Sequence, residues 1–223
     1  MRITLNLRPS IWAMLFFLLP GLLAGAETPP PAGSPTATFE QRIAGRADKI
    51  MERLALADAA PADQVRAVVL QFYRDLHSAH TDRDAQLAAA PAGDVHGLGR
   101  IRFEADKRSA QVAGEFIGAL ARRLADAQVE AVKDWMTFDM LPLSVAGYDR
   151  MFPALEARHR AQIRAWLVEN REAALIAGSA ETKLDVFRVN KLRMHAYLAA
   201  QGLDVESAVR AEEARKAAAK KSD

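Results

Sequence analysis

Two aromatic rings and three polar side chains of the kinds that bind small polar ligands lie within residues 135–171. Aromatic rings stack on the apolar C–H faces of sugars, and hydroxyl, carboxylate and guanidinium groups direct hydrogen bonds to sugar hydroxyls. The candidate ligand-binding residues are Trp135, Thr137, Asp139, Tyr148 and Arg171. The alternative role for the tryptophan is to anchor a helical core.

A second group of residues has the types and the spacing of a metal site. His77, His80 and Asp84 follow one another at i, i+3 and i+7, so on a helix they share one face. Two imidazoles and a carboxylate suit zinc or a related ion. The alternative, which we favour, is a polar helix surface on which His80 and Asp84 pair. We therefore expect no metal or other cofactor.

Sequence signatures of catalysis are weak. Asp139 with Asp149, or with Glu172, has the residue types of a glycosidase acid–base pair, but 28 acidic residues produce many such pairs by chance. No serine stands in a Gly-x-Ser-x-Gly elbow, and the glycines of residues 91–99 lack the spacing of a phosphate-binding loop. We assign no catalytic residue and favour a non-enzymatic role.

The N-terminus has the three regions of a secretory signal peptide. Arg2 and Arg8 supply positive charge, residues 11–23 form an apolar run, and residues 24–26 (Ala-Gly-Ala) are small enough for a signal peptidase. The run is shorter than the ~18 to 20 residues of a membrane span. We expect cleavage after residue 26 and a periplasmic or secreted protein without a stable membrane anchor. The alternative is an uncleaved N-terminal anchor.

The composition restricts the partners and the fold class. Removal of the two signal-peptide arginines would leave 28 basic against 28 acidic residues, so net charge gives no reason to expect a nucleic-acid partner. The chain has no cysteine, which excludes disulfides and lipid attachment and leaves packing as the source of stability. Abundant alanine and few β-branched residues favour helices.

Composition and periodicity divide the chain into four segments. We expect a signal peptide over 1–26, a Pro-rich disordered linker over 27–38, a helical domain over 39–203, and a polar C-terminal helix or tail over 204–223. The fold class is all-α, a single-domain bundle of six to seven helices. One of these helices covers residues 101–124 with Phe103 facing the core. Predicted caps and stops are Thr38 with Gln41, Gly178 with Ser179, and Gly202 with Asp204.

Residues 137–153 interrupt this helical pattern. The segment is apolar, contains two prolines and a glycine, and lacks helical spacing. We expect a non-helical segment that crosses the bundle and lines a groove.

Three predicted helix starts share a local pattern that begins at Gln64, Gln128 and Gln162. Each has Gln, a branched aliphatic residue, a charge, Ala and a large apolar residue. Convergence among Ala-rich amphipathic helices explains the pattern. Spy-like periplasmic stress chaperones and metal sensors also carry Gln-containing motifs at helix starts, and residues 124–128 (LADAQ) resemble theirs with Ala in place of Thr.

Longer motifs resemble the exported DUF3826 family. These motifs are RADKI (46–50), HTDRD (80–84), VKDWMT (132–137), AQIRAWLVENREAA (161–174), GSAETK (178–183) and YLAAQG (197–202). The resemblance spans residues 39–205 and implies an exported helical protein of unknown function, with some members labelled sugar-binding. It transfers no catalytic residue. Trp135 stands where the family pattern has a small residue. Residues 138–140 (FDM) replace a smaller, more apolar stretch of that pattern.

We therefore expect an exported, non-enzymatic binding protein whose partner is a carbohydrate or an envelope protein. The alternative is a Spy-like periplasmic stress chaperone or metal-responsive protein, and the third possibility is a glycan-active enzyme.

Overall fold

Eight α-helices and no strand make up residues 38–220, the part of the chain that this computed structural model describes. The all-α prediction is confirmed, and the predicted count of six to seven helices is too low. The predicted signal peptide (1–26) and nearly all of the predicted linker (27–38) lie outside the described residues. No described helix is long and apolar enough to cross a membrane. The helices are α1 Phe39–Leu54, α2 Ala59–Ala89, α3 Val95–Ala121, α4 Asp126–Met136, α5 Met140–Met151, α6 Ala157–Leu175, α7 Ala180–Ala200 and α8 Val205–Lys220.

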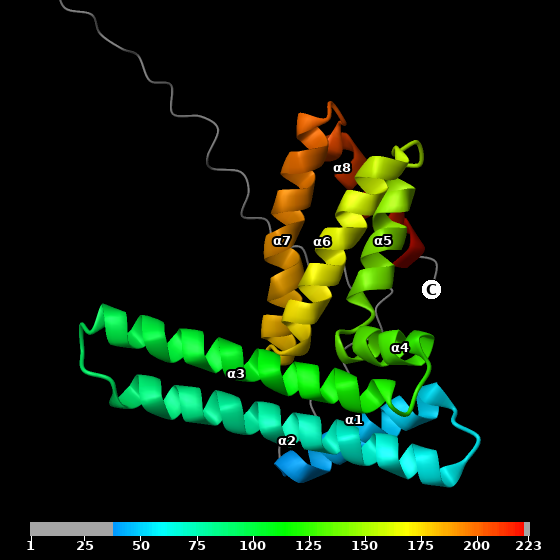
Figure 1. Cartoon of the computed structure of the whole chain (residues 1–223). Helices are drawn as coiled ribbons and strands as arrows, with labels where there is room; N and C mark the ends of the chain where they lie inside the picture. The colour runs from blue at the N-terminus through cyan, green and yellow to red at the C-terminus, as the bar shows by residue number, and fades with distance from the viewer. Residues whose placement is uncertain (1–37, 221–223) are drawn as a thin grey trace, which may run out of the picture.

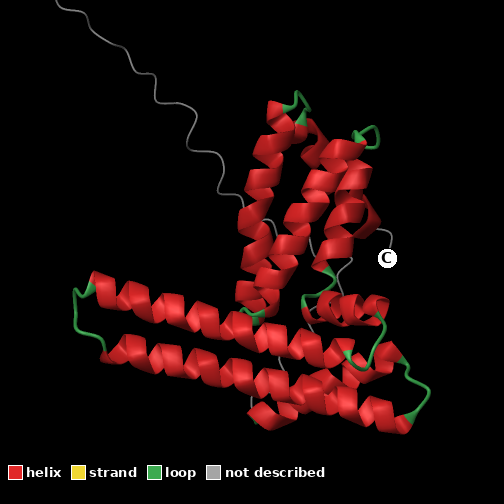
Figure 2. Ribbon diagram, viewed as in Figure 1, coloured by secondary structure: helices red, strands yellow, loops and turns green. Residues whose placement is uncertain are grey.

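The helices form two lobes that meet at an angle (Figure 1). In the first lobe, α2 and α3 make a long antiparallel hairpin, which α1 and α4 cover. In the second lobe, α5, α6 and α7 stand side by side across this hairpin, with α8 behind them (Figure 2). The molecule therefore has an inner angle, bordered by α3 and by α7.

The buried apolar side chains form two clusters, where a single-bundle core was expected. The first cluster is built by α1–α4 and includes Val69, Phe116 and Val132. The second is built by α5–α8 and includes Leu167 and Phe187. Only the C-terminal end of α6 enters the first cluster. Elsewhere a layer of charged side chains between α4 and α6 separates the two clusters. Charged groups that replace apolar contacts in this way must be paired.

The hairpin extends well beyond the first cluster. Buried residues of α2 end at Ala79, and those of α3 begin at Ser109 apart from Gly97. Residues 80–108, here called the arm, carry half-buried side chains along the seam between the two helices. The arm projects past the second lobe (Figure 1), so both of its outer faces are open.

The predicted orientation of Phe103 is wrong. Helix α3 begins at Val95 because the Asp94 side chain caps it, with Oδ1 accepting a hydrogen bond of 2.8 Å from the Gly97 amide. The side of α3 that faces α2 runs through Gly97 and Ile101. Phe103 is turned away from that side and is 66% exposed.

The predicted non-helical crossing segment, residues 137–153, is also wrong, because most of it forms α5. Phe138 and Asp139 adopt left-handed backbone angles (φ 61° and 53°) that turn the chain between α4 and α5. Pro142 is the third residue of α5, where a backbone N–H has no acceptor within the helix. Proline therefore fits there, and the apolar residues of the segment enter the second cluster.

The predicted helix boundaries near the other caps are confirmed. Thr38 and Gln41 exchange both hydrogen bonds of a capping box. Ser179 caps α7, where its hydroxyl accepts a hydrogen bond from the Thr182 amide. Asp204 accepts a hydrogen bond from the Ser207 amide at the start of α8. The capping hydrogen bonds at these ends are therefore local, between residues three apart in the sequence.

Candidate functional site

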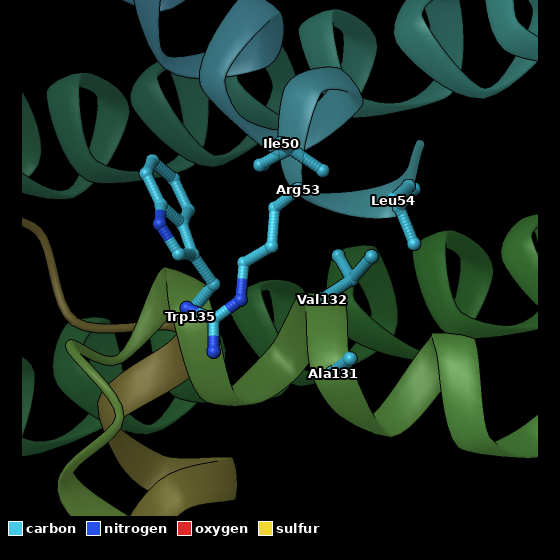
Figure 3. Close-up of a pocket in the computed structure, with 6 residues that line it drawn as sticks. All are labelled: Ile50, Arg53, Leu54, Ala131, Val132 and Trp135. Atoms are coloured by element: carbon cyan, nitrogen blue, oxygen red, sulfur yellow. The ribbon is translucent and has the colours of Figure 1, made fainter. Parts of the chain in front are cut away.

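Trp135 lies at the junction of α1 and α4. Its half-buried indole borders a shallow hollow with a cavity volume of about 10 Å³ (Figure 3). The other lining residues are Ile50, Arg53, Leu54, Ala131 and Val132. The hollow is small and mostly apolar, so it lacks the ring of directed polar groups that a sugar site needs.

Asp139 is engaged in an ion pair between α1 and the start of α5. Its carboxylate accepts two hydrogen bonds from the Arg53 guanidinium, at 2.6 and 2.9 Å. Such bidentate pairs fix both side chains. Asp139 therefore serves to hold α1 against the α4–α5 turn.

Thr137 and Arg171 are inaccessible to a ligand. Thr137 is 0% exposed, and its hydroxyl donates to the Lys133 carbonyl at 2.8 Å. Arg171 is 2% exposed and contacts Asp134 at 2.7 Å and Glu172 at 3.0 Å, in addition to Glu130. Burial acts to lower the pKa of Arg171, but hydrogen bonds to the three carboxylates outweigh it and raise the pKa.

Lys133 completes this charged layer. Its ammonium lies 2.9 Å from Glu130 and 2.7 Å from Glu172. Burial tends to raise the pKa of Glu130, yet its hydrogen bonds to Lys133 and Arg171 hold the pKa below its usual value. The layer joins α4 to α6 and offers no free functional group.

Tyr148 lies in the second cluster, away from Trp135. Its side chain is 5% exposed, and its hydroxyl has no hydrogen-bond partner among residues 38–220. Burial raises the pKa of the phenol. The ring borders a second hollow between α5 and α6, also with a cavity volume of about 10 Å³. The Asp149–Arg160 pair, at 2.6 Å, lies at its rim. The five predicted ligand residues are thus distributed over two hollows and a buried layer.

The carboxylates considered for acid–base catalysis are each neutralised separately. Asp139 pairs with Arg53, Asp149 with Arg160, and Glu172 with Lys133 and Arg171. Neither of the two hollows described above is lined by more than one of these carboxylates.

The predicted metal ligands on α2 point to different neighbours. His77 stacks on Phe39 with ring centroids 4.3 Å apart, whereas Asp84 pairs with Arg83 at 2.7 Å. His80 lies against the α6–α7 turn, where a Cβ on Gly178 would come within 2.8 Å of its Nδ1. Within residues 38–220, no group of three or more His, Cys, Asp or Glu residues is placed to hold a metal ion.

A buried lysine, which the sequence did not single out, lies beside His80. Lys183 is 8% exposed and donates hydrogen bonds of 3.0 Å to the carbonyls of Ala174 and Leu175 at the end of α6. Burial, followed by the nearby charge of Arg46, lowers the pKa of Lys183 to about 7. Burial also lowers the pKa of His80. The lysine satisfies carbonyls that the end of a helix leaves free.

Large apolar side chains are exposed on two helices, α3 and α7. Four large apolar side chains of the described chain are exposed, and they are Val95 (74%), Phe103 (66%), Val189 (64%) and Leu192 (64%). Val95 and Phe103 belong to α3, and the other two belong to α7. These are the two helices that border the inner angle (Figure 1).

The sequence carried a signal for this surface. Val189 and Leu192 lie opposite Phe187 and Met194, which fill the second cluster. Helix α7 therefore has apolar residues on two sides, whereas a helix covered on one side needs them on one side only. Val189 and Leu192 are the apolar residues that the packing of α7 leaves exposed.

Comparison with known proteins gives a family and no function. Residues 40–218 match the model of the family described as "Protein of unknown function (DUF3826)". No curated protein matches the chain.

Proposed function

The chain belongs to the DUF3826 family, whose function is unknown, and we propose that it is a non-enzymatic binding protein that holds an apolar polypeptide segment in its inner angle. This proposal keeps the expected binding role and export. It places the partner among envelope or secreted proteins and moves the binding surface from residues 135–171 to α3 and α7.

One observation carries the proposal. Phe103 on α3 and Val189 and Leu192 on α7 are each about two-thirds exposed. Each lies on the side of its helix that is turned away from the neighbouring helices. A polypeptide segment that covered these side chains would remove their apolar surface from water, which favours binding.

Carbohydrate is the second candidate ligand, and the hollow beside Trp135 favours it. The indole there shares the hollow with Arg53, the one charged side chain of its lining. The hollow has a cavity volume of only about 10 Å³, far below the ~300 Å³ at which small-molecule sites begin, so we place this ligand second.

Binding of a permanently unfolded, reduced and alkylated client protein tests the proposal. The double variant Phe103→Ser with Leu192→Ser should bind the client at least about tenfold more weakly, because buried aromatic and aliphatic anchors contribute most of the energy of such contacts. Affinity is measured by fluorescence anisotropy of the labelled client.

Val95→Ser is the matched control, because Val95 is equally exposed but lies at the tip of the arm. It should leave the affinity nearly unchanged. Equal binding by the wild-type chain and the double variant would refute the proposal. Binding of oligosaccharides that is lost with Trp135→Ala would favour carbohydrate instead.

A further inference from the structure

We propose that the segment held in the inner angle is an acidic amphipathic helix, which pairs its carboxylates with Arg100 and Lys107, the basic side chains that flank Phe103 on the arm. This inference rests on the proposed function and adds the charge and shape of the partner.

Phe103 on the arm has two basic neighbours on its own side of α3. Arg100 and Lys107 lie at i−3 and i+4 from Phe103, so they share its side of α3. Arg100 forms no ion pair with any residue that the structure describes, and Lys107 makes only a loose 3.9 Å contact with Glu104. Both side chains can therefore turn to a partner that covers Phe103.

The first half of α3 carries a net positive charge. Residues 95–108 contain four basic residues, Arg100, Arg102, Lys107 and Arg108, against two acidic residues, Glu104 and Asp106. Neither Arg102 nor Arg108 forms an ion pair within residues 38–220. A surface with this local excess attracts acidic partners although the mature chain is neutral overall.

The α7 side adds two guanidinium groups at the edge of its apolar surface. Arg188 precedes Val189 and is 75% exposed despite its pair with Asp185. Arg193 follows Leu192, stacks over Trp166 at 4.3 Å and reaches Glu169 only at 3.4 Å. Apolar residues flanked by cations thus occur on both sides of the angle.

Small residues on α3 permit the close approach of a helix. Gly99 and Ala110 lie at i−4 and i+7 from Phe103, and a Cβ added at Gly99 would meet nothing within 4 Å. Internal packing therefore does not require this glycine. A partner helix can lie close to the α3 backbone there, as small residues allow elsewhere.

The two-sided shape favours a segment over a membrane surface. A basic and apolar helix can also bind anionic lipid. However, a flat bilayer cannot contact both α3 and α7, because the arm and the second lobe meet at an angle (Figure 1). A single helix laid in the angle can contact both.

Two model peptides test the inference with the purified chain. Both have leucine on one helical face, and the other face carries glutamate in the first peptide and lysine in the second. We expect the glutamate peptide to bind more tightly, and the preference to weaken at high salt. Charge reversal by Arg100→Glu with Lys107→Glu should weaken binding of the glutamate peptide roughly tenfold and strengthen binding of the lysine peptide.

The control is the reversal Lys49→Glu with Arg164→Glu, which changes two exposed cations outside the angle and should leave both affinities unchanged. If the two peptides bind equally and Arg100→Glu with Lys107→Glu has no effect, while Phe103→Ser still weakens both, the inference is wrong and the proposed function stands. If neither peptide binds, both are wrong. Binding of phosphatidylglycerol vesicles in place of the peptides would also overturn the inference.

Discussion

At the scale of single residues, the most unusual group is the Lys183 amine. It is almost completely buried, has no carboxylate partner in the described structure, and relies on two backbone carbonyls at the end of α6. Carbonyl oxygens carry only partial negative charge, so they compensate less than a carboxylate for the cost of burying an ammonium. The depressed pKa follows from that deficit.

Lys183 should make stability depend on pH. Its pKa is about 7 in the folded chain and returns to its ordinary, higher value on unfolding, so between these values the unfolded chain binds more protons. The free energy of unfolding must then rise with pH, by about 2 kcal/mol from pH 7 to pH 9 for one such group. Urea unfolding followed by circular dichroism measures this slope.

Replacement of the amine should remove the slope. Lys183→Met leaves two carbonyls without a donor, which changes the absolute stability, but the rise between pH 7 and pH 9 should be lost. The exposed residue Lys49 provides the control, since Lys49→Met should keep the wild-type slope. An unchanged slope in Lys183→Met would show that another group is responsible.

At the scale of elements, the turn between α4 and α5 depends on a residue that is unusual for its backbone angle. Asp139 has a φ of 53°, which costs a residue with a Cβ about 1 kcal/mol relative to glycine. The same side chain is held by Arg53. At Asp139 the backbone angle therefore lowers the stability of the chain, while the ion pair with Arg53 raises it. Alanine and glycine substitutions distinguish the two effects.

Asp139→Ala should destabilise the chain by about 1 to 2 kcal/mol, because it loses the ion pair and keeps the strained angle. Asp139→Gly also loses the pair but relieves the strain, so it should be the more stable of the two. Asp149 lies within α5 and pairs with Arg160 of α6. There the alanine variant should be more stable than the glycine variant, because glycine weakens a helix. Thermal unfolding of the four variants gives both orders, and glycine below alanine at position 139 would contradict this account.

At the scale of the whole molecule, the two apolar clusters lie outside the arm. The first cluster uses α2 as far as Leu76 and α3 from Val112, so the arm contributes no member to either cluster. A projecting hairpin that is not needed for the core suggests selection for a surface, in agreement with the proposed role of α3 in binding.

Shortening of the arm tests this separation of folding from binding. Deletion of residues 81–87 from α2 together with 100–106 from α3 removes about two turns from each helix and keeps their facing sides in register. The shortened chain should unfold cooperatively with only a modest loss of stability, yet it should lose binding of the unfolded client. Calorimetry and anisotropy measure the two properties. Retained client binding would show that the arm is not part of the surface, whereas loss of cooperative unfolding would show that the core depends on it.

The sequence by itself determined the properties that follow from local patterns. The helix caps at Thr38, Ser179 and Asp204 were predictable because capping involves side chains within three residues of each helix end. The all-α class followed from periodicity and composition. Membership of the family was visible in long ordered motifs that extend over most of the chain.

The tertiary structure decided which side of each helix is buried and which residues meet. The prolines of residues 137–153 predict a break in the helical pattern, but Pro142 lies in the first turn of α5, where proline is tolerated. An apolar residue on an amphipathic helix is usually buried, and only the seam with α2 shows that Phe103 faces outward. Two of the five predicted ligand residues have partners from elsewhere in the fold. Asp139 pairs with Arg53 on α1, and Arg171 pairs with carboxylates on α4. Those partners are far away in the chain, so only folding brings them together.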